Sequence, residues 1–119
     1  MDEKVEAGEN IIVKRSFEFA LATLRYTDEL ENSRKFVVAN QLLKSGTSIG
    51  ANIREAQHAE SRADFIHKLK IAAKEAAETE YWLLLCKNSP GYPNTGILLE
   101  ELLIIQKILS KIIASSKKS

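Results

Sequence analysis

The sequence predicts an all-α protein whose helices form an antiparallel up-down four-helix bundle. Three observations lead to this prediction. Apolar residues recur every three or four positions over long segments, which is the spacing of a buried helix face. The only two prolines, Pro90 and Pro93, lie together in one short segment, so the tracts on either side lack this helix breaker. The short connections between the predicted helices favour antiparallel neighbours.

The first two helices are predicted over about Ile12–Leu30 and Arg34–His58, with Ser33 as the N-cap of the second. The apolar stripe of the second helix is Val38, Leu42, Ile49, Ile53 and Ala56. Gly46 and Gly50 flank this stripe, although each costs about 1 kcal/mol relative to alanine in a helix. We therefore expect a close backbone crossing here, against the alanine-rich face of the third helix.

The third helix is predicted over about Arg62–Lys87, with Ser61 as its cap and Asp64 in its first turn, near the positive end of the helix dipole. Its core stripe is Phe65, Leu69, Ala72, Ala76, Thr79 and Leu83. The loop Asn88–Asn94 precedes the fourth helix, predicted over about Gly96–Ala114. The domain prediction is a flexible N-terminus over 1–10, the four-helix bundle over 11–114, and a flexible basic tail over 115–119.

Composition restricts the classes of function. The chain has 119 residues, enough for one core, and its 17 basic and 16 acidic residues give a net charge of +1, without the excess of a polyanion-binding protein. Cys86 is the only cysteine, which excludes an intrachain disulfide and a cysteine-based metal site. The acidic first ten residues do not resemble a signal peptide, and Glu100 and Glu101 interrupt the longest apolar run. We predict a cytoplasmic protein without membrane contact.

Two surfaces are predicted to mediate self-association. The fourth helix carries apolar residues, including Ile104 and Ile108, around more than half of its circumference. One core-facing stripe needs only a little over 100° of a helix, so the excess is typical of an interface. On the third helix, Ile71, Glu75, Glu78 and Trp82 lie together away from the core stripe. We predict that these six residues belong to a homo-oligomer interface.

Candidate catalytic and metal-binding groups are few. Glu55 and His58 have the Glu-x-x-His spacing of di-iron bundles, and Asp64 and His67 nearly repeat it. Both pairs fall at the end of the predicted bundle, so solvated polar side chains are the favoured interpretation, with a metal at the turn as the alternative. The segment 45–51 contains two glycines but lacks the order of a phosphate-binding loop. No catalytic residue, metal ligand or cofactor is predicted.

Basic residues on the second and third helices are the candidate nucleic-acid-binding groups: Lys44, Arg54, Arg62, Lys70 and Lys74. In a monomer they form an ordinary solvated surface. Repeated around a rotational axis, the same charges would form a ring that attracts phosphates. Aromatic residues suited to base stacking are scarce in this region, which argues against sequence-specific recognition of single strands.

Two blocks, Gln41–Gln57 and Asp64–Leu83, resemble the four-helix-bundle intervening-sequence proteins. Genes for these proteins are typically found within insertions in bacterial large-subunit ribosomal RNA genes, and the proteins are often labelled ribosomal-protein-like. The resemblance extends over about Ile11–Ile113. It implies an up-down bundle and a ring-like homo-oligomer, a pentamer. Accessory variability proteins of diversity-generating retroelements are similar in design and bind nucleic acid as pentameric barrels, so the resemblance also implies RNA or DNA binding.

These observations predict a non-enzymatic, homo-oligomeric protein associated with ribosomal RNA or another nucleic acid. A second hypothesis is a protein-partner scaffold or adaptor that does not bind nucleic acid. A third is a metal-dependent enzyme that uses Glu55, His58, Asp64 and His67.

Overall fold

The computed structural model describes residues 10–118, and this part of the chain consists of four helices without strands. These helices are α2 (Ile11–Asn32), α3 (Phe36–Ala56), α4 (Arg62–Lys87) and α5 (Gly96–Lys117). The predicted all-α class is confirmed. The predicted flexible N-terminus, apart from Asn10, lies outside the described residues.

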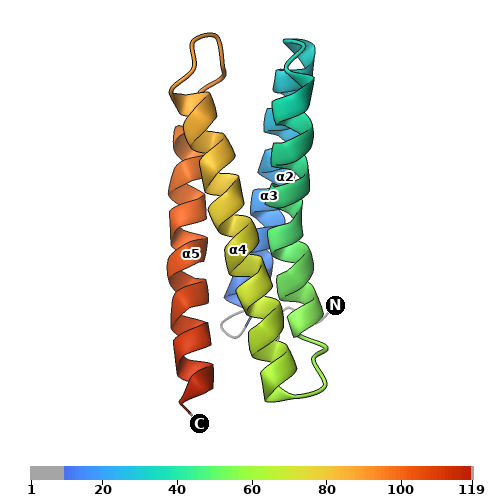
Figure 1. The fold of residues 1–119 in the computed structure, drawn as a ribbon, viewed down its shortest axis with the longest axis vertical. Helices are drawn as coiled ribbons and strands as arrows, with labels where there is room; N and C mark the ends of the chain where they lie inside the picture. Colours follow the sequence, from blue (N-terminus) through green and yellow to red (C-terminus); the bar gives the residue numbers. More distant parts are fainter. Residues whose placement is uncertain (1–9, 119) are drawn as a thin grey trace.

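Each helix packs against two others. Helices that are consecutive in the sequence are neighbours, and α2 is also a neighbour of α5, whereas no Cα atoms lie within 8 Å of each other between α2 and α4 or between α3 and α5. Figure 1 shows the four helices lying along one long axis, with chain connections at alternating ends. The described part is elongated, with extents of 47 × 28 × 21 Å. None of its helices has the length and apolar character needed to cross a bilayer.

The helix boundaries agree with the sequence prediction to within about three residues, and they differ most at the α2–α3 turn and at the end of α5. Residues 115–117, predicted to belong to a flexible tail, are the last residues of α5. The prediction that Ser33 caps α3 is wrong. Ser33 directly follows the last residue of α2, and its backbone N–H donates to the carbonyl oxygens of Glu29 and Leu30. Arg34 then adopts a positive φ of 64°, which reverses the chain direction before α3 begins. At the start of α4 the prediction is confirmed, because the Ser61 hydroxyl accepts a hydrogen bond of 3.0 Å from the Asp64 backbone N–H.

The core runs along the inner faces of all four helices. Its fully buried large side chains include Leu30 of α2, Ile49 of α3, Leu83 of α4 and Ile105 of α5. Burying such side chains stabilises the fold because apolar area leaves water. The Tyr26 hydroxyl donates a 2.8 Å hydrogen bond to the Pro93 carbonyl, which ties the α4–α5 connection to α2.

The two glycines of α3 face α2, so the predicted placement of these glycines against α4 is wrong. A Cβ atom on Gly46 would lie 2.9 Å from Thr23 Cγ2, and one on Gly50 would lie 3.2 Å from the Ser16 carbonyl oxygen. Thr23 and Ser16 are small residues of α2, so the backbones of α2 and α3 can approach each other closely here. Against α4, the buried contact is polar instead: the Ser45 and Thr79 hydroxyls are hydrogen-bonded at 2.9 Å.

Candidate functional site

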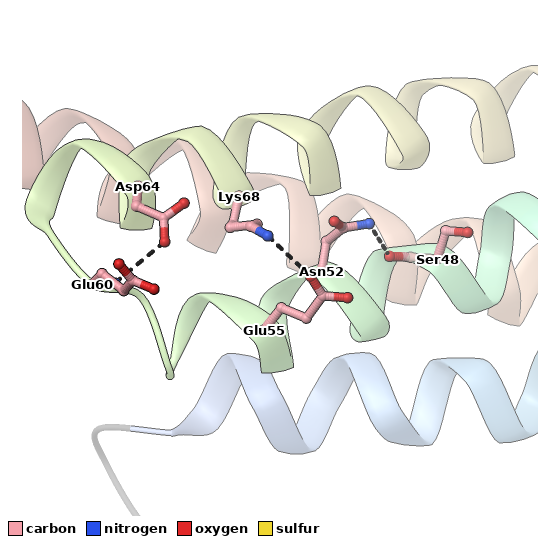
Figure 2. Close-up of polar contacts among 6 residues, drawn as sticks. All are labelled: Ser48, Asn52, Glu55, Glu60, Asp64 and Lys68. Atoms are coloured by element: carbon pink, nitrogen blue, oxygen red, sulfur yellow. Dashed lines mark hydrogen bonds and ion pairs between the residues drawn. The ribbon is translucent and has the colours of Figure 1, made fainter.

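The predicted carboxylate–histidine pairs lie around the α3–α4 turn, where the carboxylates have partners from the protein itself. Glu55 accepts an ion-pair hydrogen bond of 3.1 Å from Lys68 Nζ, which joins the two helices (Figure 2). Asp64 accepts a 3.2 Å hydrogen bond from the Glu60 backbone N–H. Figure 2 shows these contacts at the turn, separate from the Asn52 amide, which donates to the Ser48 carbonyl oxygen within α3.

The histidines His58 and His67 are both exposed to solvent, one directly after α3 and the other on α4. Within residues 10–118, no group of three or more His, Cys, Asp or Glu side chains is arranged to hold a metal ion. The contact of Glu55 with Lys68 joins α3 to α4, and the contact of Asp64 with Glu60 ties the start of α4 to the turn before it.

Cys86 is buried near the end of α4, next to Tyr26. Burial raises the pKa of its thiol, and the neighbouring Tyr26 hydroxyl opposes this shift without reversing it. The attacking species in cysteine chemistry is the thiolate, so the raised pKa disfavours reactivity. The pKa of Tyr26 is also raised, mainly by burial. Both groups are best understood as part of the core.

The five predicted basic residues do not share one face. Lys44 and Arg54 are exposed on α3, and the Arg54 guanidinium lies 5.9 Å from the centroid of the Phe17 ring on α2. Arg62, Lys70 and Lys74 are exposed on α4. The structure thus separates the set into a pair on α3, with Arg54 turned toward α2, and a group of three on α4.

Lys70 has a neighbour that sequence reasoning missed. Lys117, near the end of α5, lies beside it, and the repulsion between the two positive charges lowers the pKa of the Lys70 ammonium group. Arg62 also lies on the side of α5, because it lines a shallow hollow together with Ser115 and Ser116. A signal was present in the sequence: the final turns of α5 contain lysines and no acidic residues.

The predicted interface residues are mostly half-buried. On α4, Ile71, Glu75 and Trp82 are half-buried, and the Trp82 indole N–H donates a 3.2 Å hydrogen bond to the exposed Glu78 carboxylate. Trp82 also packs against the core cluster. On α5, Ile104 is 37% exposed, while Ile108 is half-buried against the core. Of the apolar members, Ile104 is therefore the one most open to a partner.

An apolar stripe on the outside of α2 was not predicted as an interface. Phe17, Leu21 and Leu24 follow one another at helical spacing and are 51%, 39% and 44% exposed. The same spacing in the sequence was a possible signal, because Phe19 and Tyr26 already supply the core face of this helix. Exposed apolar side chains that adjoin one another are typical of surfaces that contact other proteins.

Together, the fold and these faces define a small four-helix protein with exposed basic and apolar side chains on its outer surfaces. The chain belongs to the 23S rRNA-intervening sequence protein family, whose profile matches residues 8–112. The resemblance found in the sequence is thereby confirmed.

Among solved structures, the chain is similar to a crystal structure of a protein with unknown function from the S23 ribosomal protein family of Bacteroides thetaiotaomicron. The two sequences are 47% identical, the match covers 86% of this chain and 97% of the other, and the TM-score is 0.82. A comparison with curated proteins found no significant match.

Proposed function

We propose that this protein is a non-enzymatic, homo-oligomeric four-helix-bundle protein that associates with ribosomal RNA or another nucleic acid. The observation that carries the proposal is the exposure of Lys70 and Lys74, one turn apart on α4, in a member of this family. Within residues 10–118, neither ammonium group forms an ion pair with a carboxylate. Both positive charges therefore remain for phosphate groups of a ligand.

Nucleic-acid binding is tested by titrating structured RNA and duplex DNA with the full chain across a series of salt concentrations. We expect the logarithm of the affinity to fall linearly with the logarithm of salt, because each phosphate contact releases a counterion. The protein must first be freed of bound nucleic acid and checked for molar mass. Absence of binding to both ligands at low salt would contradict the proposed function.

The proposed assembly is an antiparallel up-down bundle repeated in a ring-like homo-oligomer, a pentamer. Exposed apolar side chains on α2, α4 and α5 support self-association, since large apolar patches on a monomer are rare. Closed rings arise when one surface contacts a different surface of the next copy. The outward side of α5 at Ile104 and the side of α4 at Ile71 are the two surfaces that the proposal assigns.

Charge placed at either surface should dissociate the assembly. We expect Ile104→Glu and Ile71→Glu to shift the molar mass measured by light scattering toward smaller species, because a carboxylate would be desolvated in the interface. Asn40→Glu is the matched control, since it adds the same charge at an exposed position of α3. An unchanged molar mass in both variants would remove these surfaces from the proposal.

A second candidate is a scaffold or adaptor for a protein partner. The exposed stripe of Phe17, Leu21 and Leu24 favours it, because apolar anchors of this kind contribute most of the energy in protein interfaces. The two candidates differ in one measurement: a scaffold would not bind RNA or DNA at low salt, and would keep a stoichiometric protein partner after nuclease treatment.

A further inference from the structure

The second half of α5 carries a net positive charge, although the net charge of the whole chain is only +1. Between Leu102 and Lys118 the sequence contains four lysines and no aspartate or glutamate. All four are exposed: Lys107, Lys111, Lys117 and Lys118. The acidic residues of this helix, Glu100 and Glu101, lie in its first turns, and Glu101 forms a 3.1 Å ion pair with Arg15 of α2.

The charged half of α5 adjoins the basic side of α4. The Gln106 amide donates a 3.2 Å hydrogen bond to the Glu80 carboxylate, so the side of α5 that carries Gln106 faces α4. Farther along the pair, Lys117 lies beside Lys70, where the like charge lowers the pKa of Lys70. An anion placed near two adjacent ammonium groups relieves their repulsion, because it is attracted to both.

At this end of the α4–α5 pair, α5 extends past the described start of α2. Arg15, in the second turn of α2, pairs with Glu101, in the second turn of α5. The two helices run in opposite directions (Figure 1). Ile11, where the described part of α2 starts, is four residues before Arg15, so it lies level with the residue of α5 that is about four positions after Glu101. Beyond that point, among the described residues, α5 has α4 as its only neighbouring helix.

The side chains on this face select a ligand class. Lysine ammonium groups act as point charges for phosphates, and base stacking needs aromatic side chains. No Phe, Tyr or Trp occurs in residues 66–80 or 97–119, and the exposed ring of Tyr81 lies seven residues beyond Lys74, so aromatic side chains are absent between the lysines. Charges spread along two helices suit a regular phosphate backbone, which a double helix presents without exposing its bases.

We propose that Lys70 and Lys74 of α4 and Lys107, Lys111 and Lys117 of α5 form an outer face that binds the sugar–phosphate backbone of double-helical RNA. This face borders the surfaces assigned to self-association, because Lys74 follows Ile71, and Lys107 and Lys111 follow Ile104, at helical spacing. The choice of RNA rests on the proposed function, and the location of the face rests on the charge distribution above. Lys44 and Arg54 on α3 lie outside this face, because α3 is not a neighbour of α5.

The test compares two double variants of the full chain on one duplex RNA. Lys107→Gln/Lys111→Gln should lower the affinity at least tenfold and reduce the salt slope by about two for each bound protomer, one unit per lost phosphate contact. Lys14→Gln/Arg25→Gln removes the same charge from exposed positions of α2. Its affinity should stay within about twofold of the unchanged protein, since it leaves the proposed contacts intact. Molar mass and helicity must be the same in all three proteins.

The outcomes separate this proposal from the proposed function. If the unchanged protein binds duplex RNA and Lys107→Gln/Lys111→Gln binds equally well, the face is wrong and the function stands. Equal losses in both variants would also overturn the face, because only total charge would matter. Tighter binding of single-stranded RNA or of duplex DNA would overturn the choice of ligand. If the unchanged protein binds no nucleic acid at low salt, the proposed function itself fails.

Discussion

Leu42→Ala is expected to lower the free energy of unfolding by about 2–5 kcal/mol. Leu42 lies in the middle of the core-facing side of α3 and is 0% exposed. The substitution removes buried apolar contacts and leaves a cavity that the surrounding helices fill only in part. Urea denaturation followed by circular dichroism measures the change, at one fixed protomer concentration because association alters apparent stability.

Val37→Ala is the control for this experiment, because it also shortens an aliphatic side chain of α3. Val37 is 74% exposed, so its truncation should change the free energy of unfolding by about 0.5 kcal/mol or less. If Leu42→Ala cost no more than this control, the burial described for α3 would be incorrect.

Gly46→Val is expected to destabilise the fold by about 3 kcal/mol, the upper end of the usual cost of overpacking. The Cβ atom alone would lie 2.9 Å from Thr23 Cγ2 and 3.1 Å from Thr23 Oγ1. Thr23 is fully buried and its hydroxyl donates a 2.8 Å hydrogen bond to the Phe19 carbonyl. It therefore cannot rotate away without losing this bond, and α2 and α3 must separate. Thermal or urea unfolding measures the loss.

A double-mutant cycle links this cost to a single contact. Thr23→Ala removes both atoms that a side chain at position 46 would meet first. Gly46→Ala should therefore cost less in the Thr23→Ala background than in the unchanged protein. Equal costs in both backgrounds would mean that the crossing of α2 and α3 does not depend on the contact between these residues.

Much of the fold is predictable from local patterns. Helical periodicity and the position of Pro90 and Pro93 identified four helices, because both act within a few residues of the chain. Ser61 was correctly identified as a cap, since its hydroxyl is bonded by the residue three positions later. Ser33 was not a cap, because Arg34 adopts a left-handed conformation and α3 begins two residues later than predicted, with Lys35 at the cap position.

Features that depend on which helices are neighbours were harder to predict. The two glycines of α3 signalled a close crossing, but only the structure identified α2 as the partner. Likewise, the spacing of basic residues within α4 identified Lys70 as a candidate nucleic-acid-binding residue. The position of Lys117 beside Lys70 depends on the packing of α5 against α4. Sequence spacing describes one face of one helix. Contacts between residues far apart in the chain depend on the packing of several faces at once.

The pattern of helix neighbours also bears on how the chain folds. Three of the four packed helix pairs join helices that follow one another directly, and only α2 with α5 requires the chain ends to come together. Closing a short loop costs little conformational entropy, so each consecutive pair can form early as a helical hairpin. Chains with such local pairing fold within microseconds to milliseconds, faster than those built on distant strand pairs. Docking of α5 onto α2 is then the step that completes the native fold.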